Sequence, residues 1–328
     1  MDISSAAIIP SNQSEVIKQC ISYLRKQTDK FKIIVIVPWG NEKQRNMVKN
    51  VIKASNLSNI DIADLTNDMG IASSRNAGIR HLQKYCDSVD FIAFLDDDTY
   101  IDINWLKYMQ EEAFMDNNDT IYSSVVRCHN NKDVIRSCGH HFDISARPLD
   151  HGYDKDIHEL KNLSDSNPPF FPCANSAFIP LKAIEAIQVY ESDVWDENFP
   201  RMTCFEFGLK LHLLKFKCKL VREARAIHYC KESKDENHVL NELYSRVLLY
   251  EKFFSKKEKD KAIRILEKDY VYGKWFKEGY SQAKTIKGRD IVNIYKCAKK
   301  KVEYISGEIS DIWKKKLLSI KLIFFEMR

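Results

Sequence analysis

The sequence lacks any apolar run long enough to cross a membrane. A transmembrane helix needs about 18 or more consecutive apolar residues, and charged residues, 30% of the 328-residue chain, interrupt every apolar run before that length. The first ten residues, MDISSAAIIP, also lack the basic segment and hydrophobic core of a secretory signal. We therefore expect a soluble globular protein located in the cytoplasm.

Paired cysteines are missing as well. The nine cysteines stand singly between Cys20 and Cys297, and none belongs to a CxxC pair, which is typical of reduced thiols rather than of a disulfide framework or a zinc site. The densest group of zinc-ligand types is Cys138, His140 and His141, but a strand would point the two histidines to opposite faces. We do not expect zinc there.

The glycine motifs of common nucleotide-binding enzymes are also absent. Neither GxGxxG nor GxxxxGK[ST] follows the first expected strand, which argues against a dinucleotide-dependent dehydrogenase and a P-loop ATPase or kinase. The loop SNQSEVIKQC lacks the Gly-rich, basic sequence that a nucleotidyltransferase needs. Basic residues are mixed with acidic ones and form no recognised nucleic-acid module, so no nucleic-acid partner is expected.

The sequence does contain a regular alternation of strand and helix patterns in its first 115 or so residues. Continuous apolar runs predict strands at 5–10, 32–37, 60–65 and 91–95, and apolar residues at helical spacing predict helices at 16–24, 47–52, 71–85 and 105–113. Such alternation is typical of βαβ units. We expect an α/β, Rossmann-like, mainly parallel sheet flanked by helices.

The pattern changes after residue 120. A strand is expected at 121–126, followed by a polar stretch up to Pro168–Pro169 that is long for a connection and is interpreted as a functional loop or lid. Later elements complete a first domain over residues 1–230. They are a strand at 176–179, helices at 181–189 and 205–215, and extended segments at 218–221 and 226–228.

Residues 231–328 are expected to form a basic, helical C-terminal extension. The last 78 residues contain 21 Lys and Arg against 11 Asp and Glu, whereas the formal charge of the whole chain is only +5. The final segment, DIWKKKLLSIKLIFFEMR, is amphipathic and can make peripheral contact with an anionic membrane. Docking on its own protein or on a partner subunit is the favoured alternative, so an oligomer stays open.

The most informative segment is FIAFLDDD, an apolar strand that ends in Asp96, Asp97 and Asp98. Three carboxylates cannot be accommodated in a core, so we expect them at the carboxyl end of the strand, where open α/β sheets bind ligands. Carboxylate oxygens suit Mg²⁺ or Mn²⁺. The alternative is a solvated acidic turn.

With these features the chain resembles family-2 glycosyltransferases of the GT-A fold, over roughly its first 230 residues. The resemblance is carried by AIIPSNQSEVIKQCISYLRKQTDKFKIIVIV, by NDMGIASSRNAGIRHL and by FIAFLDDD. Further segments, from IRSCGHHFD through FPCANSAFIPLKAI to VWDENF, resemble the rhamnosyltransferase-like branch of that family. The resemblance implies a nucleotide-sugar donor.

The resemblance also implies roles for residues in the donor half of the site. Pro10, Ser11 and Glu15 are candidate contacts of the nucleotide base or ribose. Arg75 and Asn76 would help to hold the diphosphate, since a guanidinium at a helix start is a good phosphate site. Arg75 shares a helix face with apolar residues, so we expect it to point toward the sheet.

The same resemblance assigns the metal and sugar contacts. Asp96 and Asp98 would bind Mn²⁺ or Mg²⁺, and Asp97 would contact the ribose or donor. Asn175 would face the donor sugar. His228, in AIHYC, would be a third ligand of the metal or diphosphate, although a lone histidine is as often structural.

Two positions depart from the family pattern. No acid follows the second strand, which reads Val37-Pro38-Trp39-Gly40, so the base is open and Trp39 is a candidate for stacking. Thr203-Cys204 stands where a Glu-Asp pair is expected. Neither side chain is a carboxylate, so the catalytic base is assigned to Glu206, with Asp196 or Glu197 as alternatives.

These features together predict a metal-dependent, inverting hexosyl- or deoxyhexosyltransferase. Its acceptor would be a glycan, a lipid-linked molecule or another hydroxyl compound, in surface polysaccharide or glycoconjugate biosynthesis. The alternative, motivated by the missing Glu-Asp pair and the basic extension, is a catalytically inactive glycosyltransferase-like binding subunit.

Overall fold

The structure is a computed structural model that describes residues 3–65, 70–116, 119–142, 148–163, 168–229 and 236–262. Those residues form two compact units. The first unit takes its described residues from Met1–His141, Asp150–Glu197 and Phe207–Cys230, and the second takes its described residues from Phe142–Leu149, Asn198–Glu206 and Lys231–Arg328. The domain boundary expected near residue 230 stays a prediction.

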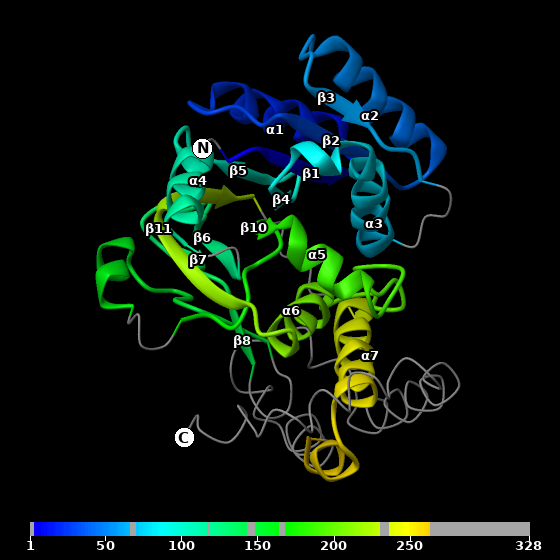
Figure 1. The fold of residues 1–328 in the computed structure, drawn as a ribbon, viewed down its shortest axis with the longest axis vertical. Helices are drawn as coiled ribbons and strands as arrows, with labels where there is room; N and C mark the ends of the chain where they lie inside the picture. The colour runs from blue at the N-terminus through cyan, green and yellow to red at the C-terminus, as the bar shows by residue number, and fades with distance from the viewer. Residues whose placement is uncertain are drawn as a thin grey trace. The chain divides into compact units, whose positions relative to one another are not determined.

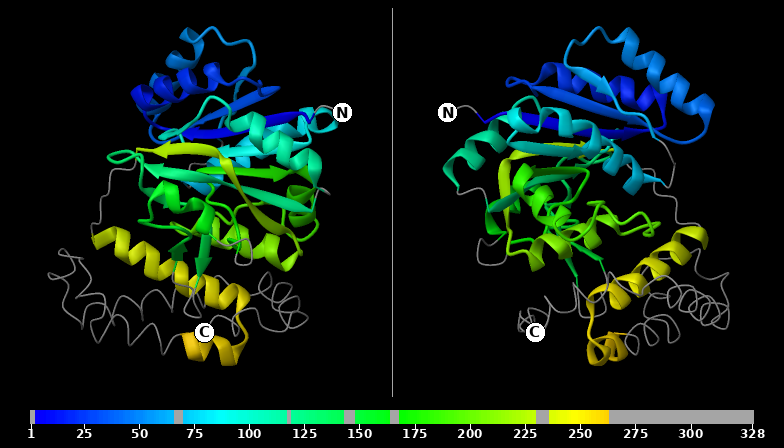
Figure 2. Two further views of the ribbon diagram at one scale, coloured as in Figure 1. Left: turned by 90° about the vertical axis from the view of Figure 1, so that its left-hand side faces the viewer. Right: turned by 45° about the vertical axis from the view of Figure 1, so that its right-hand side comes forward.

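The first unit is built on a mixed sheet with helices on its faces (Figure 1). Its strands are β1 (Ser5–Ser11), β2 (Ile33–Pro38), β3 (Ile60–Ile62), β4 (Phe91–Leu95), β5 (Thr99–Ile101), β6 (Thr120–Cys128), β7 (Ile135–Ser137), β10 (Ser176–Pro180) and β11 (Lys217–His228). In spatial order they run β3-β2-β1-β4-β10-β6-β11-β5, with β7 paired to β6. Figure 2 shows the first strands, in blue, toward one margin of the sheet and β11, in yellow-green, farther across it.

The helices are α1 (Ser14–Lys26), α2 (Glu42–Ala54), α3 (Ile71–Leu82), α4 (Trp105–Met115), α5 (Leu181–Gln188), α6 (Thr203–Leu213) and α7 (Glu236–Phe253). Local sequence fixes several of their ends. The side chain of Asn41 accepts a hydrogen bond from the backbone N–H of Gln44, and the Gln44 side chain returns one to Asn41, a capping box that starts α2. None of the described helices has the length and apolarity to cross a membrane.

The strand pairing confirms the expected α/β fold and adds detail to it. The expected alternation produces the parallel pairs β1–β2, β2–β3 and β1–β4. The second half of the sheet is mixed, because β10 runs antiparallel to both β4 and β6, whereas β11 runs parallel to β6. Strands β6 and β11 therefore run in the same direction as β4.

Alternate residues of the central strands point to opposite faces of the sheet. Ala7 and Ile9 of β1 belong to the core cluster that also contains Ile17 and Ile21 of α1 and Val48 of α2. Ile8 points the other way, toward α3, where a β-carbon on Gly78 would lie only 2.5 Å from its Cγ2 atom. Gly78 therefore permits close packing of α3 on β1.

Aromatic residues fill the same face beside α3. Phe94 of β4 makes edge-on contacts with the rings of Trp195 and Phe207, at centroid distances of 5.3 and 5.9 Å, and Trp195 stacks on Phe207 at 4.2 Å. These three side chains are 2% exposed or less. The segment around Trp195 is thus held against the strand that ends in the three aspartates.

The polar stretch interpreted from the sequence as one long loop contains regular structure. Besides β7 it holds the short strands β8 (His140–Phe142) and β9 (Pro148–Asp150) and a 3₁₀ helix at Ile157–Asn162.

The Nε2 atom of His141 lies 2.9 Å from Nδ1 of His151. Burial, together with the neighbouring histidines, lowers the pKa of His141 to about 4.

The second unit contains α7, which carries several buried charges. Arg246 is fully buried, and Lys252 donates a hydrogen bond of 2.8 Å to Glu206. Lys259 forms an ion pair of 2.8 Å with Glu251. The expected amphipathic segment at the C-terminus lies outside the described residues.

We expect Gly78→Ala to destabilise the protein. A methyl group there clashes with Ile8, and overpacking of this kind costs about 1–3 kcal/mol, more than the gain of up to about 1 kcal/mol in helix propensity. Urea unfolding measures the loss. In an Ile8→Ala background the same substitution should cost much less, because Cγ2 is gone; an equal cost in both backgrounds would show that the clash is not the cause.

We expect stability to fall as the pH drops from about 6.5 to 4. The unfolded chain protonates His141 near its ordinary pKa, whereas the folded chain does so only near 4. Between these values the unfolded state binds the extra proton, which removes up to about 1.4 kcal/mol per pH unit. Thermal unfolding of His141→Gln across this range should show a shallower slope; an unchanged slope would assign the effect to other groups.

Candidate metal and donor site

Several of the sequence-predicted residues meet at one edge of the sheet, the carboxyl edge of β1, β4 and β11. β1 and β4 are parallel, and β11 has the same direction through β10 and β6. Ser11 at the end of β1, the aspartates after β4 and His228 at the end of β11 therefore lie on this edge. The Ser11 hydroxyl donates a hydrogen bond of 2.6 Å to Oδ2 of Asp97.

Three backbone hydrogen bonds fix the turn that carries the aspartates. The N–H of Asp96 donates to the carbonyl of Asn175 at 3.2 Å, and the N–H of Thr99 donates to the carbonyl of Asp96 at 3.1 Å. The N–H of Tyr229 donates to the carbonyl of Asp98 at 2.9 Å. The turn is thus bound both to the strand that follows Asn175 and to the end of β11.

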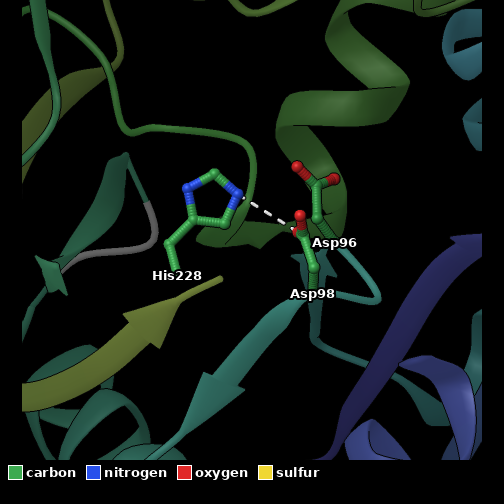
Figure 3. A group of neighbouring side chains, drawn as sticks. All are labelled: Asp96, Asp98 and His228. Atoms are coloured by element: carbon green, nitrogen blue, oxygen red, sulfur yellow. Dashed lines mark ion pairs between the residues drawn. The ribbon is translucent and has the colours of Figure 1, made fainter. Parts of the chain in front are cut away.

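The three side chains predicted as metal ligands converge. Asp96, Asp98 and His228 each offer one ligand atom, and these atoms lie within 4.8 Å of one another. Figure 3 shows the imidazole of His228 directed from the end of β11 toward the two carboxylates, with a 3.1 Å contact between its Nε2 and Oδ1 of Asp98. Their side chains are 29%, 31% and 15% exposed, so the group is accessible from solvent.

Burial, together with the crowding of negative charge, alters the titration of this group. Burial is the main cause that raises the pKa of Asp96, against the Arg75 charge, and the charge of Asp98 adds to it. Burial also raises the pKa of Asp97 to about 7, although the Ser11 hydrogen bond opposes this. Burial alone would lower the pKa of His228, but Asp98 and Asp96 together raise it. A cation placed among these groups would relieve the repulsion.

Arg75 is the cation that α3 supplies to this edge. Its side chain is only 3% exposed, and its Nη2 atom lies 2.9 Å from Oδ1 of Asp96. The guanidinium also lies over the indole of Trp195, 4.5 Å from the ring centroid. Arg75 thus points toward the sheet, as its position on the helix indicates, and binds the acidic turn directly.

Asn76 holds the backbone of Trp195 at two points. Its Oδ1 atom accepts from the N–H of Trp195 at 2.9 Å, and its Nδ2 group donates to the carbonyl of Trp195 at 2.8 Å. The same Nδ2 group lies 3.0 Å from Oε1 of Glu197. The predicted role of Asn76 is a contact with the donor, and its contacts with Trp195 have no counterpart among the sequence-based predictions. The two adjacent acids after Trp195, in WDEN, are the sequence feature that could have marked this segment as part of the site.

The remaining predicted contacts occupy different environments. Pro10 is buried within β1, and Glu15 lies exposed in the first turn of α1. Asn175 is 6% exposed, and its Oδ1 atom accepts a 3.3 Å hydrogen bond from the Ser176 hydroxyl. The N–H of Trp39 donates to the carbonyl of Ser11 at 2.9 Å. The roles assigned to Pro10, Glu15 and Asn175 stay predictions.

Glu206, predicted as the catalytic base, belongs to the second unit. It is fully buried on α6, and its Oε1 atom accepts the 2.8 Å hydrogen bond from Lys252 of α7. Thr203 is also buried, whereas Cys204 is partly exposed. The catalytic role of Glu206 stays a prediction.

Known structures share this fold. The structure of GalNAc-T7 with UDP, GalNAc and Mn²⁺ matches with a TM-score of 0.61 and 16% identity, covering 92% of this chain and 57% of that one, so the chain spans little more than half of GalNAc-T7. S. aureus TarS 1-349 with UDP-GlcNAc matches at 0.52 and 15%, covering 95% and 84%. The mannosyltransferase PcManGT from Pyrobaculum calidifontis, with GDP-Man and Mn²⁺, matches at 0.52 and 10%, covering 97% and 80%.

No curated protein sequence matches the chain. The model of one protein family, glycosyl transferase family 2, matches residues 5–187, more than half of the 328 residues. The matched range includes β1, α3 and the acidic turn after β4. The chain therefore belongs to glycosyl transferase family 2.

Proposed function

We propose that this protein is a metal-dependent, inverting glycosyltransferase that takes a sugar from a nucleotide-diphosphate donor. The observation that carries the proposal is the convergence of Asp96, Asp98 and His228 at the carboxyl edge of the sheet, with Arg75 bound to the same turn. Family membership supports the reaction class. Similar folds crystallised with UDP-GlcNAc or with GDP-Man and Mn²⁺ support the donor class.

The three converging side chains fit a divalent cation. Two carboxylates and one imidazole provide oxygen and nitrogen ligands that suit Mn²⁺, and Mg²⁺ is the alternative. A cation bound there would stabilise the negative charge that develops on the departing nucleotide diphosphate.

The chain itself would supply the rest of the donor site. The guanidinium of Arg75, which contacts Asp96 and Trp195, would present a fixed positive charge to the diphosphate. Asp97, which accepts a hydrogen bond from Ser11, would contact the ribose. Asn175, whose carbonyl accepts a hydrogen bond from the turn, would face the transferred sugar.

Inversion requires a base that removes the proton of the acceptor hydroxyl. Glu206 is the candidate that the sequence indicates. To act as the base it would have to reach the acceptor although it is fully buried and bonded to Lys252. Asp196 and Glu197, both partly exposed, are the alternatives.

The finer specificity belongs to the same proposal. The rhamnosyltransferase-like segments favour a deoxyhexose or hexose donor, and the acceptor would be a glycan or lipid-linked hydroxyl compound in polysaccharide synthesis. A cytoplasmic location and peripheral membrane contact through residues 311–328 remain predictions. The second candidate function, an inactive binding subunit, is favoured by Thr203 and Cys204 at the position of the expected acidic pair.

We expect Asp98→Asn to weaken Mn²⁺-dependent binding of a nucleotide strongly. Wild-type protein should gain thermal stability with UDP or GDP plus Mn²⁺, because a ligand at about 100 times its Kd adds about 2.7 kcal/mol. The variant should lose most of this shift, since one of three ligands is gone. Asp193→Asn, which removes an exposed partner of Arg80, is the matched control and should keep it.

Release of nucleotide from a donor panel tests the reaction itself. Wild-type protein with Mn²⁺ should slowly hydrolyse one of UDP-GlcNAc, UDP-GalNAc, GDP-Man or a nucleotide-linked rhamnose, and Asp98→Asn should not. Binding of nucleotide and Mn²⁺ without release from any donor would support the inactive subunit instead. An absence of Mn²⁺-dependent nucleotide binding in the wild type would contradict the proposed metal-dependent transferase.

A further inference from the structure

We propose that Glu197 is the general base of the transfer reaction and that Asn76 positions it. This inference rests on the proposed function and names a residue for a role that the family pattern leaves empty here. It depends on the contacts of the segment Glu191–Glu197, which follows α5 and packs on α3.

Glu197 is tied to α3 through a side chain that also fixes its backbone neighbour. The Nδ2 group of Asn76 lies 3.0 Å from Oε1 of Glu197 and 2.8 Å from the carbonyl of Trp195, and Oδ1 accepts from the N–H of Trp195. The Asn76 amide thus makes the same pair of hydrogen bonds to Trp195 that a residue of a neighbouring β-strand would make. The backbone two positions before Glu197 is therefore fixed, and the amide also directs the carboxylate.

The same segment is connected to the acidic turn. The guanidinium of Arg75 lies over the ring of Trp195, and it forms an ion pair of 2.9 Å with Asp96. Each step in the chain from Asp96 through Arg75 and Trp195 to Glu197 is a direct contact or a short stretch of backbone. Through these contacts the backbone next to Glu197 is connected to the turn whose residues would receive the leaving group.

Three other acids of this region, Glu191, Asp193 and Glu206, have carboxylates that form ion pairs. Glu191 has an 8% exposed side chain and forms an ion pair of 2.8 Å with Lys210, which is itself fully buried. Asp193 forms a surface ion pair with Arg80. Glu206 is fully buried and bonds Lys252. Glu197 is partly exposed and its described partner is a neutral amide, so it can meet an acceptor hydroxyl from solvent.

The proposed step is a single displacement. The acceptor oxygen forms a bond to the anomeric carbon as the bond from that carbon to the diphosphate oxygen breaks. The nucleotide diphosphate leaves with the electron pair of the broken bond, and the acceptor proton passes to the Glu197 carboxylate. The configuration at the anomeric carbon is inverted, and with water as acceptor the same step is donor hydrolysis.

The test measures Mn²⁺-dependent nucleotide release from the best donor of the panel in Glu197→Gln, Glu206→Gln and Asp196→Asn. We expect Glu197→Gln to lower kcat by about 10²- to 10⁴-fold, because the base is lost, with unchanged KM for the donor and an unchanged thermal shift with UDP or GDP plus Mn²⁺. Asp193→Asn, an acid of the same segment on the surface, is the matched control and should keep wild-type kcat.

Retained kcat in Glu197→Gln would overturn the inference and leave the proposed function standing. Loss of kcat in Asp196→Asn or Glu206→Gln alone would move the base to that residue. A raised KM with unchanged kcat in Glu197→Gln would make Glu197 a donor-binding residue and also overturn the assignment. Wild-type protein that releases nucleotide from no donor would contradict the proposed function and the inference together.

The positioning role of Asn76 has a separate readout. Asn76→Ala should lower kcat about tenfold or more in the wild-type background but much less in Glu197→Gln, because the positioned carboxylate is already absent. Equal effects in both backgrounds would show that Asn76 acts only on the fold.

Discussion

The ion pair between Arg75 and Asp96 is the contact on which the rest of the site depends. A guanidinium stays charged in proteins, so burial to 3% exposure is tolerable only with a charged partner and further contacts. Asp96 provides the charge and the face of Trp195 provides the contact. Because Arg75 belongs to α3 and Asp96 follows β4, one pair joins a helix, the acidic turn and the segment before Glu197. The helix that packs closely on β1 through Gly78 therefore also orients the carboxylates at the edge of the sheet.

Much of this architecture could be predicted from the sequence because it depends on apolar runs. Strands covered on both faces are continuously hydrophobic, so 5–10, 32–37 and 91–95 were recognisable, and the expected α/β fold is confirmed. The acidic turn was recognisable for the same reason, since a buried strand ends abruptly in three charged residues. Strands that run in the same direction end at the same edge of a sheet. Ser11 therefore meets Asp97, 86 positions later in the chain, and His228 meets Asp96 and Asp98 although it lies more than a hundred residues after them.

The features that escaped prediction have no periodic signal. The bonds between Asn76 and the Trp195 backbone join residues 119 positions apart, and nothing local in either sequence indicates the pairing. Three short strands lie in a stretch whose polarity favoured a loop, because three-residue strands are held by pairing rather than by an apolar pattern. The single strand β11 was interpreted as two segments, since its register shifts between Val221 and Arg225 and interrupts the alternation.

The balance of charge at the sheet edge constrains how a donor can bind. Arg75 pairs with Asp96 at 2.9 Å, and burial, with repulsion from the neighbouring carboxylates added to it, raises the pKa values of Asp96 and Asp97. A nucleotide diphosphate would add further negative charge to the same place. At about 4 Å and an effective dielectric constant near 20, each pair of like charges costs on the order of 4 kcal/mol. Arg75 alone cannot offset this repulsion, because its charge is already paired with Asp96. We therefore expect the donor to bind only together with a divalent cation that neutralises the remaining negative charge.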